Sequence, residues 1–465
     1  MNGNNLKENR LSIGLSQGKL ADLSGIAQAK ISAFELGKSH LSFEQISILE
    51  NTLKQLDGDD VVKINKKRFH KVADGARIIE SLPRRSFSRT HRNPDYLREL
   101  ESLEIAFSKE RDNNKPKAIS FFAGCGGLCY GIKAAGFDVI AANELVDSYK
   151  EIYAENFPDA TFLPNDIRDI ESEHLLDYVG VDLMIGGPPC QGFSLAGKRD
   201  VNDDRNSLFR DYLNIADIVK PKVILMENVK LLTSMKDPNG HYVKDRILET
   251  FNHHGYTSEF YELNAKHYGV PQDRQRVFFV GVRKDLNIAP SRPNLVTPEE
   301  CDFFTSGATP YSFGDATSDL EFLESSEKSS TDDYHWAVNH PEHVLRWLAD
   351  VKQGKSAHDN VEKNLRPASG YNTTYKRQVW NEPASTVATT FGMISGCRNV
   401  HPIATRSLTI REALRLQSFP NSFKLKGKNG DIRTTIGNAV PPKLAYEIGR
   451  HLLNTIFYKN SPPED

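Results

Sequence analysis

The chain of 465 residues has few cysteines and no long apolar run. The five cysteines stand at positions 125, 129, 190, 301 and 397, so their number is odd and no Cys-x-x-Cys pair occurs. This pattern suggests neither a disulfide framework nor a zinc site, and no histidine has the carboxylate or cysteine spacing of a metal site. No apolar run approaches about 18 residues, and the start of the chain lacks the apolar core of a signal peptide. We therefore expect a soluble protein of a reducing cytosol, with no metal and no membrane partner.

The net charge of −2 gives no general sign of a nucleic-acid partner, but the charge is unevenly distributed. Residues 63–92 contain many lysines and arginines and only two acidic residues, Asp74 and Glu80. A solvated linker and a phosphate-contacting stretch are both consistent with this composition. Its place between two candidate DNA-binding parts favours the second interpretation.

The first 60 residues have a helical period and contain a compact motif over residues 16–37. Ser16 can cap a first helix, Gly25 can form the turn, and an apolar face follows on the next helix at Ile26, Ile31 and Phe34. The motif resembles the helix-turn-helix of the Cro/C1 repressor family, although Ala27 stands where a Ser or Thr cap would be expected. The resemblance implies that DNA is contacted from the second helix, by Gln28, Lys30 and Ser32. A purely structural helical hairpin is the alternative.

From residue 117 onward, apolar strands alternate with amphipathic helices, which predicts a doubly wound α/β sheet. The expected strands are 118–122, 138–142, 181–185, 223–226 and 276–282. Residues 287–400 break into short polar pieces with one helical segment at 341–351, and clear helices return at 409–417 and 443–456. We expect an all-α N-terminal domain at 1–60, a basic linker at 61–115, a catalytic domain at 116–286 with 401–465, and an inserted domain at 287–400.

One cysteine is held by rigid and small residues at the end of an expected strand. Cys190 lies in the sequence Gly-Pro-Pro-Cys-Gln-Gly at 187–192, where the prolines fix the backbone before the thiol and Gly192 frees it afterwards. The next strand ends in Glu227. Because consecutive parallel strands expose their carboxyl ends on one edge, Cys190 and Glu227 can share a crevice as nucleophile and proton donor.

A glycine-rich turn, Phe-Ala-Gly-Cys-Gly-Gly at 122–127, follows the first strand of the sheet and opens a helix. Bare backbone N–H groups at such a turn let a ligand approach closely. Glu144 follows the second strand, at the place where nucleotide-binding folds keep an acid for ribose hydroxyls, and Asp166 can accept from an adenine amino group. Together they suggest an adenosine-containing cofactor; the alternative is that the glycines only allow tight packing.

Six blocks in order resemble the DNA (cytosine-5)-methyltransferases, over roughly residues 117–456. They are the glycine turn, Pro-Cys-Gln at 189–191, Glu-Asn-Val at 227–229, Gln-Asp-Arg-Gln-Arg at 272–276, Arg-Glu-Ala at 411–413 and Gly-Asn-Ala-Val at 437–440. The resemblance implies a Rossmann-like methyltransferase sheet, S-adenosylmethionine as cofactor, and a target cytosine flipped out of double-stranded DNA.

The resemblance also implies roles for single residues. The Cys190 thiolate would add to cytosine C6, Glu227 would hold N3 protonated, and Arg274 and Arg276, pointing the same way, would grip the O2 carbonyl and a nearby phosphate. The implied cofactor pocket consists of Phe122, Gly124, Gly126, Gly127, Glu144, Asp166, Ile167, Pro189, Leu208 and Asn438. Implied DNA contacts near the thiol are Gln191, Ser194 and Lys198, within or beside a polar stretch at 196–205 that is typical of a mobile closing loop.

The leading hypothesis is a bacterial, cytoplasmic modification enzyme whose insert reads a short duplex sequence. It would work as a monomer, and the helix-turn-helix would bind a separate operator as a dimer and repress its own promoter. A transfer-RNA cytosine-5 methyltransferase and a repressor with an inactive methyltransferase body are the rivals. The sequence identifies neither the DNA sequence recognised nor the base that removes the C5 proton.

Overall fold

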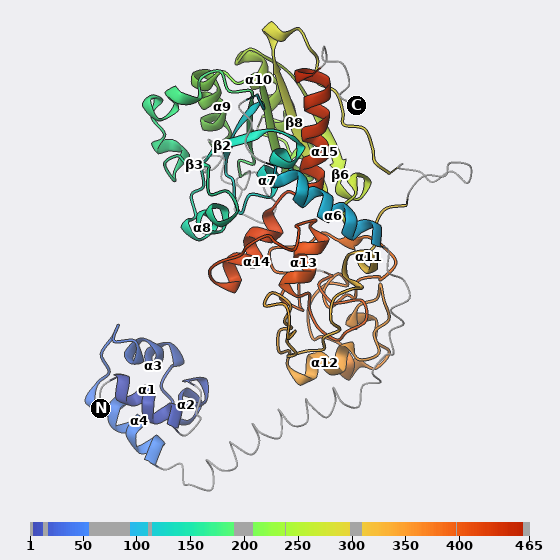
Figure 1. The fold of residues 1–465 in the computed structure, drawn as a ribbon. Helices are drawn as coiled ribbons and strands as arrows, with labels where there is room; N and C mark the ends of the chain where they lie inside the picture. Colours follow the sequence, from blue (N-terminus) through green and yellow to red (C-terminus); the bar gives the residue numbers. More distant parts are fainter. Residues whose placement is uncertain are drawn as a thin grey trace. The chain divides into compact units, whose positions relative to one another are not determined.

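The structure is a computed structural model that describes residues 3–12, 17–54, 94–109, 114–189, 208–237, 239–297, 309–396 and 398–458 (Figure 1). It contains two compact units, an N-terminal one and a larger one. Cys190, Gln191, Ser194, Lys198 and the polar stretch at 196–205 lie outside the described residues, as does the whole basic stretch at 63–92.

The N-terminal unit consists of short helices: α1 (Gly3–Ser12), α2 (Gln17–Ser24), α3 (Gln28–Glu35) and α4 (Phe43–Lys54). The turn between α2 and α3 is made at Gly25, whose φ of +69° lies in the left-handed region that favours glycine. As predicted, Ile26, Ile31 and Phe34 are buried and form the core with Leu6, Leu20 and Leu49. The helix-turn-helix expected from the sequence is thus present as α2, the Gly25 turn and α3.

A buried ion pair ties the first three helices of this unit together. Glu35 at the end of α3 accepts from Arg10 Nε at 2.7 Å and from Gln17 Nε2 at 2.7 Å. Both charged side chains of the pair are almost fully buried. Removing one partner would leave the other buried and unpaired, which makes this pair a determinant of how α1 sits against α3.

The larger unit is built on a seven-stranded sheet with the order β3-β2-β1-β4-β5-β8-β6. The parallel strands are β1 (Lys117–Phe121), β2 (Asp138–Ala142), β3 (Thr161–Phe162), β4 (Leu183–Gly186) and β5 (Val223–Val229). β8 (Gln275–Arg283) pairs antiparallel with β5, and β6 (Tyr256–Asn264) pairs antiparallel with β8. The doubly wound α/β fold is confirmed, and the strand order reverses beside β1, where such sheets bind ligands.

Both faces of the sheet are buried, which explains why its central strands are nearly continuous apolar runs. Ala118, Leu183 and Val223 belong to one core together with α7 (Gly127–Ala135), α8 (Asp147–Asn156) and α15 (Pro442–Leu452). Ile119, Met184 and Ile224, one residue further along each strand, belong to a second core with α9 (Leu208–Val219) and α10 (Val243–His253). Short helical turns complete this part: η1 (Ile167–Asp169), η2 (Ser172–Tyr178), η5 (Lys230–Ser234), η6 (Ala265–Tyr268), η7 (Lys284–Leu286) and η10 (Leu453–Phe457).

One helix stands where a basic linker was expected. α6 (Pro94–Phe107) lies inside the expected linker at 61–115, yet Tyr96, Leu100 and Leu103 are buried in the first core of the sheet. These positions recur at the i, i+4, i+7 spacing of one helix face, which is the reason the segment docks. Residues 94–107 therefore belong to the larger unit.

The insert at 287–400 has little regular structure, as the sequence predicted. Its elements are α11 (Phe313–Thr317), α12 (Glu342–Leu348), η8 (Ala357–Asp359), η9 (Lys363–Leu365) and β9 (Ala384–Ser385). β9 pairs in parallel with β7 (Gln272–Asp273), a strand of the catalytic part, and this ribbon joins the two. The chain then continues into α13 (Ile410–Leu416) and α15, close to the predicted helices, and between them lies α14 (Asn429–Asn438), which was not predicted.

Buried charges hold the irregular backbone of the insert. The Arg377 guanidinium donates to the carbonyls of Leu348, His401, Ile403 and Ala404 and is 1% exposed. Such carbonyls have no partner in a regular ladder, so one fork-shaped donor satisfies several of them at once. Just beyond the insert, Arg406 makes a two-pronged ion pair with Glu412 of α13 at 2.7 and 2.8 Å.

Candidate active site

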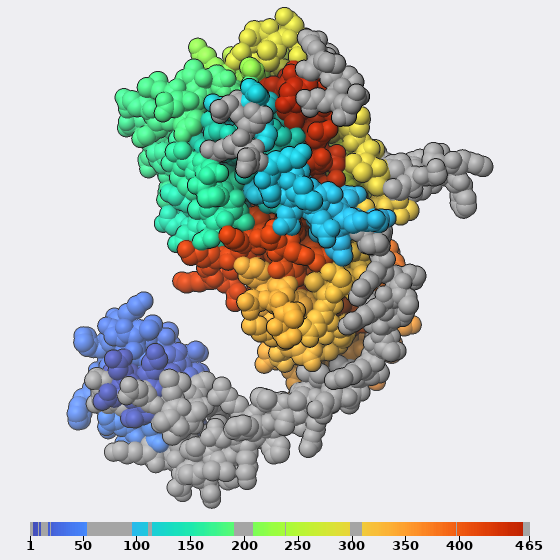
Figure 2. All heavy atoms as spheres, viewed as in Figure 1, coloured from blue at the N-terminus to red at the C-terminus, as the bar shows by residue number. Residues whose placement is uncertain are grey.

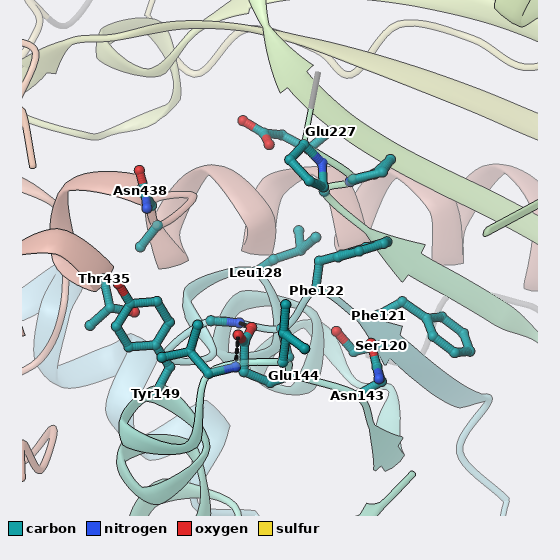
Figure 3. Close-up of a pocket in the computed structure, with 18 of the residues that line it drawn as sticks. Ser120, Phe121, Phe122, Leu128, Asn143, Glu144, Tyr149, Glu227, Thr435 and Asn438 are labelled. Atoms are coloured by element: carbon teal, nitrogen blue, oxygen red, sulfur yellow. Dashed lines mark hydrogen bonds between the residues drawn. The ribbon is translucent and has the colours of Figure 1, made fainter. Parts of the chain in front are cut away.

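A large cavity opens at the carboxyl ends of the central strands, with a volume of about 1070 Å³. Phe122 follows β1, Glu144 follows β2, Pro189 follows β4, and Glu227 lies on β5, so consecutive strands each contribute to one pocket. Figure 3 shows Glu227 at one end of the pocket and Glu144 with Tyr149 at the other, while Thr435 and Asn438 of α14 face it from the side. The size suits a ligand larger than a single nucleobase.

The glycine turn is shaped by backbone that only glycine adopts without strain. Gly124 and Gly126 have φ values of +57° and +93°. A Cβ at Gly124 would make an ordinary contact with Thr435 Oγ1 at 3.7 Å, whereas a Cβ at Gly126 would clash with Phe157 at 2.5 Å. Gly124 and Gly127 therefore line the cavity, and Gly126 serves the packing of the turn on α8.

Two carboxylates lie at the Gly124 end of the cavity. Glu144 accepts from the N–H groups of Gly124 at 2.8 Å and Val146 at 2.9 Å, and burial raises its pKa. Asp166 is held by Arg168, whose side-chain hydrogen bonds lower the pKa of Asp166. Each carboxylate keeps further lone pairs for hydroxyl or amino donors of a ligand. Ile167 and Leu208 add apolar wall, as expected.

Thr435 and Tyr149 also line this cavity, and the sequence analysis missed them. The Thr435 hydroxyl is buried and makes no hydrogen bond in the described part of the chain, so it is available to a polar ligand. Thr435 lies three residues before Asn438 on α14, and this i, i+3 spacing was the signal that could have found it.

At the opposite end, Glu227 forms an ion pair with Arg276, whose Nε lies 2.9 Å from Glu227 Oε1. Burial raises the pKa of Glu227, and the positive charge of Arg276 opposes that rise. The Asn228 amide donates to the Pro188 carbonyl at 2.9 Å and so fastens the end of β4 to β5. Gly187, Pro188 and Pro189 line the cavity and lead to Cys190, the next residue in the chain.

The two arginines of the 272–276 block do not share one direction. Arg276 lines the cavity, but Arg274 is fully buried and donates to the carbonyls of Val387, Gly437 and Asn438. The expected common orientation assumed one regular strand, and the break between β7 and β8 at Arg274 removes that condition. Arg274 thus joins the insert to the end of α14.

The polar groups of the pocket fit an adenosine-containing ligand. The open side of Gly124, the unpartnered Thr435 hydroxyl and the carboxylates of Glu144 and Asp166 offer close approach and polar partners at one end. An acid and an arginine lie at the other end. The cavity can therefore hold an extended ligand whose reactive end lies near Glu227.

In the N-terminal unit, the predicted DNA-contacting residues lie on α3. Gln28 and Lys30 are exposed, and Ser32 is partly exposed. Ala27 makes no side-chain cap; instead the Ser24 hydroxyl accepts from the N–H of Ile26. No helix in the described residues is long and apolar enough to span a membrane.

Comparisons with known proteins agree with this geometry. The family model described as C-5 cytosine-specific DNA methylase matches residues 116–454, and a helix-turn-helix model matches residues 6–60. The Type II methyltransferase M.DdeI of Desulfomicrobium norvegicum is 35% identical over 377 residues, which covers 72% of this chain and 88% of the relative. M.PspPI of a Psychrobacter strain is 28% identical over 436 residues and covers 87% of this chain and 96% of the relative.

Solved structures share the fold. A chain from an E. coli prophage, assigned as a DNA modification methyltransferase, aligns with a TM-score of 0.57 at 24% identity, covering 73% of this chain and 99% of that one. Spodoptera frugiperda DNMT2 aligns with a TM-score of 0.51 at 19% identity, covering 72% of this chain and 98% of that one. From the matched length and the relatives, the chain belongs to the C-5 cytosine-specific DNA methylases and carries a helix-turn-helix domain at its N-terminal end.

Proposed function

We propose that this methylase transfers a methyl group from S-adenosylmethionine to C5 of a cytosine in a short duplex DNA sequence, as the modification enzyme of a type II restriction-modification system. The observation that carries the proposal is one cavity with Glu144 and Asp166 at one end and the Glu227–Arg276 pair at the other. Such an enzyme works in the bacterial cytoplasm, where the DNA is.

Cofactor binding uses the Gly124 end of the cavity. Glu144 accepts from the ribose hydroxyls, Asp166 accepts from the adenine amino group, and Asn438 and Thr435 face the amino-acid end. When bound, the cofactor supplies a methyl group on a positively charged sulfur. Phe122, Ile167, Pro189 and Leu208 exclude water from the apolar parts of the ligand.

The chemistry requires cytosine C5 to become a nucleophile, and residues near Glu227 provide for this. The Cys190 thiolate adds to C6 and makes C5 electron-rich. C5 then takes the methyl group of a bound cofactor as the bond between that methyl carbon and the sulfur breaks, with the sulfur leaving as a neutral thioether. Glu227 in its protonated form donates to N3 and so offsets the charge that develops on the ring. Loss of the C5 proton then re-forms the double bond and expels the thiolate.

Arg276 holds the Glu227 carboxyl in place and reaches the O2 carbonyl of the same base. Arg274 acts on the reaction indirectly, because its guanidinium donates to backbone carbonyls of Val387 and Gly437 and so connects the insert to α14. The insert at 287–400 reads the DNA sequence, with Gln191, Ser194 and Lys198 contacting the strand near the flipped base.

We further propose that the N-terminal domain binds a separate operator as a dimer through Gln28, Lys30 and Ser32. The helix-turn-helix model matched at residues 6–60 and the exposure of Gln28 and Lys30 on α3 support this proposal. A footprint on DNA upstream of the coding region tests this, comparing the parent with a Gln28→Ala, Lys30→Ala variant. The absence of a discrete protected site would favour a general DNA clamp.

The central experiment measures label transfer from S-[methyl-³H]adenosylmethionine to duplex DNA and to transfer RNA. We expect incorporation into DNA only, in the parent but not in Cys190→Ser, whose hydroxyl gives no thiolate equivalent at neutral pH. Plasmid sequencing for 5-methylcytosine then gives the recognised sequence. Transfer to RNA would refute the DNA assignment, and normal transfer by Cys190→Ser would refute the nucleophile.

A further inference from the structure

Helix α6 lies outside both family matches, which end at residue 60 and begin at residue 116. It is nevertheless built into the larger unit, with Tyr96, Leu100 and Leu103 buried. In the space-filling view α6, in light blue, lies beside the orange and red segments of the insert and the C-terminal helices (Figure 2). The helix is thus part of the larger unit although the methylase model begins after it.

On one side α6 is fastened to the catalytic part. Phe107 stacks on Tyr130 of α7 with ring centroids 3.8 Å apart, and the Lys133 ammonium of α7 lies over the Phe107 ring, 4.4 Å from its centroid. Glu99 Oε2 lies 3.3 Å from the Lys443 ammonium of α15. These contacts fix the helix on α7 and α15, which pack on the sheet that carries the cavity.

On the other side the same helix is fastened to the beginning of the insert. The Tyr311 hydroxyl donates to Glu99 Oε1 at 2.7 Å, and the Tyr96 and Tyr311 rings lie 5.1 Å apart. Burial raises the pKa of Tyr311, so its hydroxyl stays a donor at neutral pH. Tyr311 lies two residues before α11, the first helix described in the insert.

The junction continues from Tyr96 into α13. The Tyr96 hydroxyl donates to the Arg415 carbonyl, and the Arg415 guanidinium forms an ion pair with Asp319 of the insert at 3.0 Å. Glu99 therefore gives one carboxylate oxygen to the insert and the other to the catalytic part, while Tyr96 contacts the helix that links them. Glu99 and Tyr96 therefore contact both the insert and the catalytic part, and they can set the angle between these parts directly.

We propose that α6 is a brace that fixes the insert relative to the catalytic cavity, with Glu99 as its positioning residue. The inference rests on the proposed function, since the property it sets is the placement of bound DNA over the site. Loosening the brace weakens productive DNA binding and sequence discrimination while leaving the cofactor pocket intact, because no residue of α6 lines that pocket.

The test compares Glu99→Ala with Glu101→Ala in the full chain. Glu101 lies on the same helix and has the same charge, but its side chain is exposed. We expect Glu99→Ala to raise the KM for target DNA on the order of tenfold, the value of one charge-assisted hydrogen bond, and to lower discrimination against near-target DNA. The Kd for S-adenosylmethionine should stay within about twofold of the parent by calorimetry.

Two further measurements separate positioning from stability. Glu99→Gln keeps an acceptor for Tyr311 and should recover part of the loss, and hydrogen exchange should rise in residues 309–320 of Glu99→Ala alone. A lower Tm with an unchanged KM and unchanged discrimination would overturn the brace. If the parent itself transfers no label to DNA, the proposed function fails, and the hydrogen-exchange comparison still decides whether α6 holds the insert.

Discussion

Replacing Glu227 with glutamine tests whether a protonated carboxyl drives the reaction. The side chain is 13% exposed and lies 2.9 Å from Arg276 Nε, so it acts in a dry, preorganised setting. Removing one such donor to a developing charge costs about 3 kcal/mol, which is on the order of a hundredfold in rate. Glutamine keeps the shape but cannot transfer a proton to N3.

The assay is single-turnover methyl transfer with enzyme in excess, together with DNA and cofactor affinities. We expect the chemical step to fall on the order of a hundredfold while both affinities stay within a few-fold. Glu259→Gln, an exposed carboxylate on β6, is the matched control. Equal losses in binding and in turnover would refute the proton-donor role and leave Glu227 as a structural carboxylate.

The pH dependence gives a second readout of the same residue. Burial raises the pKa of Glu227, so its neutral form persists to higher pH than that of an ordinary glutamate. Loss of the Glu227 proton should therefore make the single-turnover rate fall as the pH rises through this pKa. Because Arg276 opposes the rise, Arg276→Gln should move the falling limb to higher pH, and a limb that does not move would contradict the coupling.

Three more outcomes follow from the structure. Gly124→Ala and Gly126→Ala both place a side chain at a positive φ, so both should lower Tm, and the fall should be larger for Gly126→Ala, whose Cβ also meets Phe157 at 2.5 Å. Gly124 lines the cavity and Gly126 does not, so Gly124→Ala alone should weaken cofactor binding; calorimetry and thermal melting distinguish the two variants. Burial lowers the pKa of His340 to about 4 and of His401 to about 3, so both fold as neutral rings. The contribution of these neutral histidines to the free energy of unfolding is complete above the unfolded pKa of about 6.5, and it decreases as the pH drops below that value. Tm should therefore fall over this range, and a Tm constant down to pH 5 would contradict this. Removal of residues 1–60 should leave label transfer to target DNA largely intact, and a raised KM for DNA of any sequence would instead indicate a clamp.

The sequence predicted the central strands and several residues of the cavity because their signals are local. Buried apolar runs followed by glycine or a carboxylate mark strand ends, and Glu144 and Asp166 line the cavity as expected. β6 was missed because an edge strand with half-exposed positions has a weak pattern, and β8 gave no sign that it runs antiparallel.

Other features depend on contacts between distant segments. Arg274 faces carbonyls of Val387 and Gly437, more than a hundred residues away, so no pattern around position 274 reveals its direction. Gly126 lines no pocket because Phe157 occupies the space beside it. α6 was assigned to a linker since the basic stretch before it dominates the local composition.

The short ribbon of β7 and β9 has a consequence for how relatives of this protein can diverge. Gln272 accepts from the Val387 N–H and donates to the Leu416 carbonyl and the Gln417 side chain, so the returning end of the insert is fixed to a strand that lies shortly before the insert begins. A length of chain anchored at both ends can be exchanged for another without moving either anchor. The insert can therefore be exchanged by recombination near this ribbon. With the proposed role of the insert, one methylase could acquire the DNA preference of another in a single genetic event.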